Sequence, residues 1–310
     1  MVTFSAKERN VNEEKERLIR KGGQNNMRGI ETRIQDIRHM VFTEVARMAY
    51  QDEVPVEKQI EKIPYEIIPG DVANFRNDVF LERAIVGERV RLAMGLPCRD
   101  AGNQAPISED VEAADRPETY YTPPLINIIK FACNACPEKR LMVTEGCMGC
   151  LAHPCMEVCP KDAVHLDRTI GRASIDQDKC IKCGRCATAC SYNAIITQER
   201  PCAAACGMDA IHSDSQGKAE IDYDKCVSCG MCLVNCPFGA ISDKSQIFQV
   251  IRGIQAGEHI YAAIAPAFVG QFGPKVTSGK LRAAIKQLGF TDVFEVAIGA
   301  DHCAVKEADD

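Results

Sequence analysis

The cysteines constrain this chain more than any other feature. Sixteen of its 18 cysteines lie between Cys133 and Cys236, and the other two are Cys98 and Cys303. In a reducing compartment, cysteines at such density are typical of metal ligands rather than of disulfides. The first residues contain no apolar core of a secretory signal, which indicates a cytoplasmic protein.

The dense region is built from recurring spacings. Two runs share a Cys-x2-Cys-x2-Cys-x3-Cys pattern and a third has a longer middle gap: Cys180–Cys190, Cys226–Cys236 and Cys147–Cys159. This spacing is typical of [4Fe–4S] clusters in bacterial ferredoxins, because three thiolates on one tight loop hold three corners of a cube while the fourth points to a second cube. Zinc is the alternative, since paired C-x2-C knuckles also build four-thiolate sites.

An internal repeat accounts for one of the two shorter cysteine pairs. Two segments recur at offsets of 46 and 47, namely 171–195 as 217–241 and 153–167 as 200–214. The pair Cys202 and Cys206 is therefore equivalent to Cys155 and Cys159. A repeat of this kind predicts two related metal-binding units.

The second copy of the repeat lacks two thiolates. The positions equivalent to Cys147 and Cys150 are Ala194 and Thr197, which cannot ligate iron. A spare C-x2-C pair upstream has the right internal spacing to replace them. We therefore expect this pair to complete the second unit.

Sixteen thiolates then make four sets of four, because each ferredoxin run lends its last cysteine to its partner. The predicted ligands are Cys147, Cys150, Cys155 and Cys190 for cluster one; Cys159, Cys180, Cys183 and Cys186 for cluster two; Cys206, Cys226, Cys229 and Cys232 for cluster three; and Cys133, Cys136, Cys202 and Cys236 for cluster four. The alternative is a chain with three clusters, in which Cys133 and Cys136 are ordinary buried thiols.

Five other residues could in principle ligate metal. His153, His165 and His212 lie among the cysteines, and imidazole replaces thiolate in some clusters. Because sixteen cysteines already suffice, we expect these histidines to be turn residues or neighbours of the ligands. We expect Cys98 and Cys303 to be small buried apolar residues.

The flanking sequence predicts regular structure on both sides of the cysteines. Apolar residues at helical spacing predict helices over 27–50 and 77–96. After the cysteines, apolar runs predict strands over 259–269 and 292–298, with a helix that begins at Thr277 or Ser278 between them. A β-α-β order indicates the start of an α/β domain with a parallel sheet. Two strands and one helix cannot cover both faces of such a sheet, so a partner or further chain is expected.

We therefore predict an α+β fold with five parts. These are a helical N-terminal domain at 1–98, an acidic Pro-containing surface linker at 99–124, tandem ferredoxin-like dicluster units at 125–200 and 201–243, and an incomplete, truncated α/β segment at 244–310. The net charge of −6 argues against nucleic acid as a partner. The apolar runs are shorter than the roughly 20 residues that cross a bilayer, so we expect no membrane span.

Three stretches together resemble the monomeric [FeFe] hydrogenases. They are the segment KFACNACPEKRLMVTEGCMGCLAHPCMEVCP, the paired cysteine runs, and HIYAAIAPAFVGQFGPKVTSGKLRAAIKQLGFTDVFEVAIGAD near the end. The resemblance is strongest to the branch with several ferredoxin-type clusters before the catalytic domain. It implies an oxidoreductase that relays electrons between ferredoxin and the catalytic cluster, where protons are reversibly reduced to dihydrogen in an anaerobic host.

The chain departs from that family at the catalytic cluster. The family holds this cluster with TSCCP-like, MPC-like and ACxxGC-like motifs, and none of them occurs here. We therefore assign no catalytic residue, and whether the chain acts as an enzyme stays open. The leading interpretation is the N-terminal portion of a hydrogenase; the alternative is a free-standing polyferredoxin that docks on a catalytic subunit. A third interpretation, a redox or iron sensor, has no basic DNA-binding helix to support it.

Overall fold

The chain divides into two compact units in the computed structural model. The described residues are 32–51, 54–100, 102, 104–115 and 122–309. The helical unit comprises the described parts of 1–95, 105–120 and 246–310, and the cysteine unit comprises those of 96–104 and 121–245. Within these residues no helix is both long and apolar enough to cross a bilayer.

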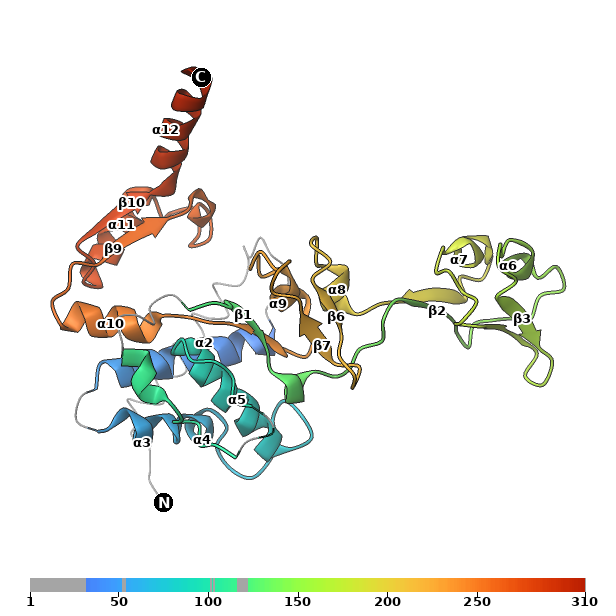
Figure 1. Ribbon diagram of the computed structural model, residues 1–310, viewed down its shortest axis with the longest axis horizontal. Helices are drawn as coiled ribbons and strands as arrows, with labels where there is room; N and C mark the ends of the chain where they lie inside the picture. The colour runs from blue at the N-terminus through green and yellow to red at the C-terminus, as the bar shows by residue number, and fades with distance from the viewer. Residues whose placement is uncertain (1–31, 52–53, 101, 103, 116–121, 310) are drawn as a thin grey trace. The chain divides into compact units, whose positions relative to one another are not determined.

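The helical unit is built around three helices, drawn in Figure 1. Its α-helices are α2 (Arg33–Ala49), α3 (Val56–Ile60), α4 (Ile63–Ile67), α5 (Val79–Ala93), α10 (Ile247–Gln255), α11 (Ser278–Gln287) and α12 (Val296–Asp309), and the three that pack together at its centre are α2, α5 and α10. Helix α2 packs against α5 and α10, and it buries Val41, Val45 and Met48. These buried residues lie at the helical spacing noted in the sequence, so the two expected N-terminal helices are confirmed. The first residues of the earlier one, 27–31, lie outside the described part.

Part of the segment expected as a surface linker is packed into the helical unit. It forms a short 3-10 helix, η1 (Val111–Asp115), in which Ala114 is buried. The buried Arg91 guanidinium donates hydrogen bonds to the carbonyls of Ile107 and Glu109 at 2.7 and 2.6 Å. Proline and acidic residues predict exposure, but this arginine satisfies the carbonyls that packing removes from water.

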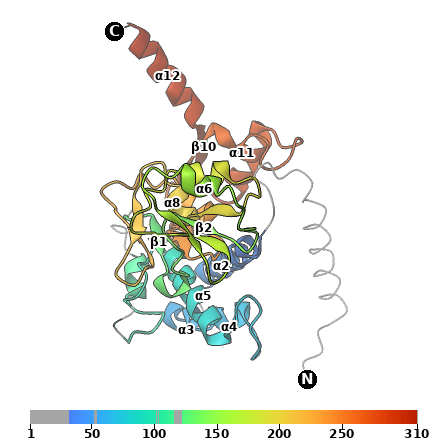
Figure 2. The same cartoon turned by 90° about the vertical axis from the view of Figure 1, so that its right-hand side faces the viewer.

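The expected β-α-β order near the end of the chain is confirmed. Strands β9 (Tyr261–Ile264) and β10 (Asp292–Glu295) are parallel, and helix α11 (Ser278–Gln287) between them lies beside β10 in Figure 2. The Thr277 side chain caps α11 by accepting from the Lys280 N–H.

Three expectations are wrong. The first strand was expected over 259–269, but it ends at Ile264 and is followed by a short 3-10 helix, η4 (Pro266–Phe268). The second strand ends at Glu295, and the following apolar residues begin helix α12 (Val296–Asp309). A short apolar run is compatible with either structure, so its periodicity did not distinguish them. Cys303 is exposed on α12 rather than buried, and Cys98 is only partly buried.

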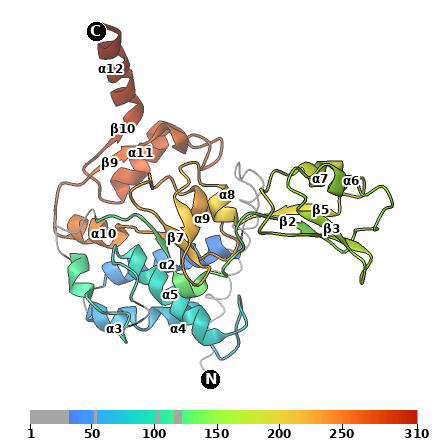
Figure 3. The ribbon, with the colours of Figure 1, turned by 45° about the vertical axis from the view of Figure 1, so that its right-hand side comes forward.

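The cysteine unit consists of antiparallel strand pairs and short helices. Its strands are β1 (Ile126–Ile128), β2 (Arg140–Val143), β3 (Val164–Asp167), β4 (Arg172–Ile175), β5 (Ile195–Gln198), β6 (Ile211–Ser213), β7 (Ala219–Ile221) and β8 (Ile241–Asp243). Its helices are α6 (Pro154–Glu157), α7 (Arg185–Ala189), α8 (Pro201–Ala204) and α9 (Met231–Asn235). Helices α6 and α7 lie side by side in Figure 3, and α8 and α9 contact each other in the same way.

The strand pairing shows two related halves. One half contains the pairs β2–β5 and β3–β4, and the other contains β1–β8 and β6–β7. Strand β1 thus pairs with the end of the second copy of the repeat, although we expected residues 125–200 to form the first unit alone. The β1 segment leads directly to the spare cysteine pair, so both belong with the second half. We call the half that contains β2–β5 the first half and the other the second half.

Candidate metal centres

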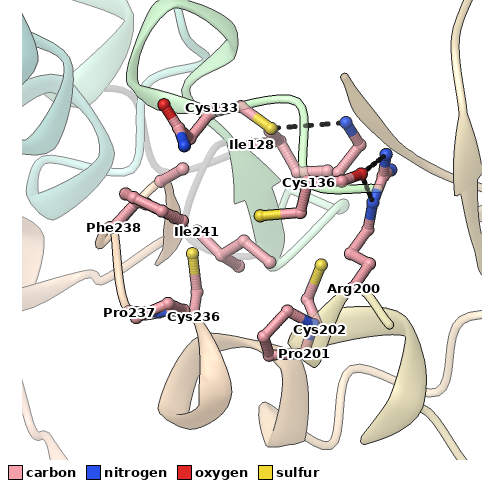
Figure 4. A pocket seen from close by; sticks show the side chains of 13 residues that line it. Ile128, Cys133, Cys136, Arg200, Pro201, Cys202, Cys236, Pro237, Phe238 and Ile241 are labelled. Carbon is pink, nitrogen blue, oxygen red and sulfur yellow. Dashed lines mark hydrogen bonds between the residues drawn. The ribbon is translucent and has the colours of Figure 1, made fainter. Parts of the chain in front are cut away.

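Four thiols from distant parts of the chain line one cavity, shown in Figure 4. They are the set predicted for cluster four: Cys133, Cys136, Cys202 and Cys236. The first two lie on the loop after a short 3-10 helix, η3 (Lys130–Ala132), whereas Cys202 lies in α8 and Cys236 directly follows α9. The rest of the wall is mostly apolar and includes Ile128, Phe238 and Ile241. The structure therefore brings together the two spare cysteines and the two that lacked partners.

Two further cavities each collect one predicted set. The cavity in the first half is lined by Cys147, Cys150, Cys155 and Cys190. The other, in the second half, is lined by Cys206, Cys226, Cys229 and Cys232. Each set combines cysteines from two runs, as the exchange of the last cysteine between ferredoxin-type runs requires.

The set predicted for cluster two is only partly gathered. Cys159, Cys180 and Cys186 pack into one apolar cluster of the first half. Burial raises the pKa of the Cys186 thiol, and the neighbouring Cys180 and Cys159 raise it further. Cys183 is exposed. Its counterpart in the second half, Cys229, is also exposed and yet lines its cavity.

The buried thiols are poor anions without a bound cation. Burial raises the pKa of Cys202 to about 11, and the nearby Cys236 and Cys133 add to the rise. Burial likewise raises the pKa of Cys232 to about 11, with Cys226 as a further cause. Metal binding removes the thiol proton and neutralises the thiolates. The environments of Cys202 and Cys232 therefore fit a group rich in metal cations.

Hydrogen bonds to sulfur are equivalent for one cysteine of the spare pair and one cysteine of the first half. In the first half, the Ala173 N–H donates to Cys147 Sγ at 3.4 Å. In the second half, the Ala219 N–H donates to Cys133 Sγ at the same distance. Ala173 and Ala219 are equivalent in the repeat. Cys133 therefore occupies the position of Cys147, although it lies far upstream of the rest of the second half.

The backbone conformation supports the same equivalence. Gly149, which precedes the second cysteine of the first pair, has a φ of +57°. Ala135, at the same place in the other pair, has a φ of +45°. Left-handed backbone is unusual for a non-glycine residue, so its recurrence marks a shared loop geometry.

The last cysteine of two runs and of the pair Cys202 and Cys206 accepts a hydrogen bond from the residue four positions later. The donors are the N–H groups of Ala163, Ala194 and Ala210, and the acceptors are Cys159, Cys190 and Cys206, at 3.2, 3.4 and 3.4 Å. Burial opposes ionisation of Cys159, but several backbone N–H groups lower the pKa of this thiol below its ordinary value. Such bonds also stabilise the negative charge of cluster-bound sulfur.

The thiols are arranged around cavities and not around a point. Among the described residues, no three His, Cys, Asp or Glu side chains converge where one metal ion would sit. His165 and His212 lie at exposed strand positions, and His153 precedes α6.

One charged residue beside the cluster-four cavity is not among the predicted site residues. Arg200 lines this cavity and is only 3% exposed. Its sequence signal is weak, since it is a single arginine before a Pro-Cys pair, where the first half has His153. The repeat alignment contains this difference, but only the structure shows what the arginine contacts.

Two families match parts of the chain. Residues 258–310 match the C-terminal domain of the iron-only hydrogenase large subunit. Residues 172–195 and 218–241 match a 4Fe-4S binding domain. The second match covers the two cysteine runs of the repeat, so these sites are related to known iron–sulfur domains.

Three known proteins are similar to parts of the chain. Iron hydrogenase 1 of Clostridium pasteurianum is 34% identical over 200 residues, which are 59% of this chain and 33% of that protein. An uncharacterized ferredoxin of Methanocaldococcus jannaschii is 40% identical over 67 residues, 20% of this chain and 43% of the ferredoxin. The polyferredoxin-like subunit of an aliphatic sulfonate oxidoreductase of Pyrococcus furiosus is 38% identical over 48 residues, 16% of this chain and 28% of that subunit. The chain thus spans less than half the length of each relative.

These matches agree with the geometry on the nature of the cofactor. The chain is an iron–sulfur protein with ferredoxin-type sequence, and its cofactors are [4Fe–4S] clusters. The hydrogenase matches relate it to redox proteins and imply redox partners in general.

Proposed function

We propose that this chain is the electron-transfer module of an [FeFe] hydrogenase-type enzyme, with four [4Fe–4S] clusters in tandem ferredoxin-like dicluster units. The observation that carries this proposal is the convergence of three predicted cysteine sets on three separate cavities. When bound, each cluster accepts and releases one electron. The protein supplies thiolates, apolar walls and N–H···S hydrogen bonds, which together set how readily each site takes an electron.

The sixteen cysteines of the four predicted sets are the proposed ligands. Three sets surround cavities, and cluster two would be completed by Cys183 at the surface. The equivalence of Cys133 and Cys147 supports four clusters over three. Cys133 accepts the same backbone hydrogen bond as the proposed ligand Cys147, which is not expected of a thiol that only packs.

The region after the clusters supports a hydrogenase context. The matched residues 258–310 form the parallel β9–α11–β10 arrangement. Tyr261 and Phe294 on this strand pair are more than half exposed, which suits a surface that the rest of a catalytic domain would cover. In the proposed enzyme, electrons would pass between a ferredoxin and a catalytic cluster that reduces protons reversibly. None of the three motifs that hold that catalytic cluster in the family occurs in this stretch.

A free-standing polyferredoxin is the second candidate, and the match to a polyferredoxin-like subunit favours it. In that case the exposed β9–β10 surface would dock on a separate catalytic subunit. Sequencing the gene and its transcript beyond the codon for Asp310 distinguishes the two. Continuation into a TSCCP-like motif supports the hydrogenase, whereas a stop codon supports the carrier.

A spectroscopic experiment tests the electron-transfer role itself. The anaerobically prepared protein should be brown, and its broad absorption should bleach on addition of dithionite. Its reduced state should give the electron paramagnetic resonance (EPR) spectrum of interacting [4Fe–4S] centres. A colourless protein that contains zinc would refute the proposal.

A further inference from the structure

We propose that Arg200 is a positioning residue that holds the Cys133–Cys136 loop in place for cluster four and supplies a buried positive charge beside it. This inference rests on the proposed function, since it concerns one of the four clusters. It adds a specific residue outside the cysteine motifs. It also accounts for how a half-motif from another part of the chain can complete the second half.

The need for such a residue follows from the chain order. In the first half, Cys147 and Cys150 lie on the loop that runs directly into α6, which carries Cys155. In the second half, the equivalent loop ends at Cys136, 64 residues before Arg200. The first half lies between them, and its β2–β5 pairing places Arg140 opposite Gln198, so the two segments are brought near each other without being directly continuous in the chain. Noncovalent contacts must therefore fix the loop against α8.

Arg200 makes those contacts. Its guanidinium donates two hydrogen bonds to the Cys136 carbonyl, from Nε at 3.2 Å and from Nη2 at 2.8 Å. The same group donates to the carbonyls of His212 and Gly217 at 3.0 and 2.7 Å and to Ser213 Oγ at 3.0 Å. It thus joins the ligand loop to the β6–β7 hairpin. An arginine guanidinium has five donors in a fixed planar fork, whereas a lysine ammonium has three donors on one atom.

A second cation ties the same two segments. Lys130 Nζ, just before the loop, donates to Asp214 Oδ2 at 2.7 Å and to the Ala219 carbonyl at 3.0 Å. Ala219 is the residue whose N–H donates to Cys133 Sγ. Both ends of the ligand loop are therefore attached to the β6–β7 hairpin by cations. Lys130 is partly exposed whereas Arg200 is buried, so Arg200 is the stronger candidate.

The charge of Arg200 also acts on the site. Its guanidinium is hydrogen-bonded to the Cys136 carbonyl, and Arg200 lines the same cavity as Cys136 and Cys202. A buried positive charge next to a cluster stabilises its more negative, reduced state and raises its reduction potential. The first half has His153 at the equivalent position, so cluster one lacks this permanent charge.

The test compares Arg200→Gln, Arg200→Lys and the control Arg168→Gln in the full chain prepared anaerobically. Arg168 is an exposed arginine in the hairpin turn of the first half. Iron and acid-labile sulfide are counted, and EPR-monitored redox titration gives the potential of each centre. Arg200→Gln should lose up to about four of about 16 irons per chain, and any retained cluster four should have a lower potential. Arg200→Lys should keep more iron than Arg200→Gln, with a potential near that of the wild type.

Each other outcome overturns the inference. Full iron content and unchanged potentials in Arg200→Gln would show that the arginine neither holds the loop nor acts on the cluster. Equal loss of all clusters in Arg200→Gln would show a general folding role instead of a local one. A wild-type chain without any [4Fe–4S] cluster would refute the proposed function itself, whereas four clusters with the same potentials in both wild type and Arg200→Gln would refute only this inference.

Discussion

Gly149 offers a sharp test of the loop that would hold cluster one. This residue has a φ of +57°, and a Cβ placed on it would lie 2.1 Å from the Gly171 carbonyl oxygen. The approached atom belongs to the backbone of the β3–β4 hairpin turn. The substitution Gly149→Ala therefore cannot be accommodated by rotating a side chain.

The expected cost has two parts. A left-handed backbone costs an L-residue roughly 1–2 kcal/mol. The contact must also open by about 1 Å or more to reach ordinary separation, and such backbone shifts cost about 1–3 kcal/mol. The loop geometry required by the ligands is then disfavoured by about 2–5 kcal/mol, or at least about 30-fold in population.

The assay is the iron and sulfide content of anaerobically prepared Gly149→Ala, together with its unfolding by guanidinium chloride. We expect loss of cluster one, with clusters three and four retained. The matched control is Ala135→Gly in the second half. Ala135 already has a φ of +45°, and its Cβ has ordinary separation from the Cβ position of Gly217. The control should keep every cluster and be equally or slightly more stable.

Wild-type iron content and unchanged stability in Gly149→Ala would refute this reasoning. That result would mean that the loop of Cys147 and Cys150 can leave the hairpin without loss of the cluster. Loss of cluster four in place of cluster one would contradict the ligand assignment.

Three further predictions address other parts of the molecule. Cys202→Ser should remove one cluster, about four irons, and leave the EPR signals of clusters one and two unchanged. Gln249→Leu should destabilise the helical unit by about 2 kcal/mol in denaturant unfolding, because buried Gln249 Nε2 donates to two carbonyls at 2.7 and 2.8 Å that would lose their partner. Hydrogen bonds from the Val293 N–H and from the side chains of Arg282 and Lys286 hold the pKa of Asp292 below its ordinary 3.8. Its charged form is thus favoured by folding, so Asp292→Asn should speed hydrogen exchange in α11 and β10 at pH 7, and this difference should shrink as the pH falls below 3.8.

The thiol sets were largely accessible from sequence because ligand spacing is a local property. The run from Cys226 to Cys236 fixes three ligands on one loop, and the repeat then identifies the donor of the fourth. The number of cysteines also predicted that Cys133 and Cys136 share a cluster with Cys202 and Cys236. These four residues line one cavity in the structure. The β-α-β order followed in the same way from apolar runs and one helix cap.

The remaining features depend on contacts between distant residues. Composition could not show that Arg91 and Gln249 draw residues 105–115 into the helical unit. Nor could spacing show that β1 pairs with β8, because a strand of three residues carries little pattern. The contacts of Arg200 could not be predicted from the sequence either, because its acceptors lie up to 64 residues away along the chain.

Chemical analysis of the anaerobically purified chain tests the central claim most directly. Sixteen cysteines in four sets predict about 16 iron atoms and about 16 acid-labile sulfides per chain, all as [4Fe–4S] in Mössbauer spectra. About 12 of each would contradict the fourth cluster. Zinc in the absence of labile sulfide would contradict the whole account.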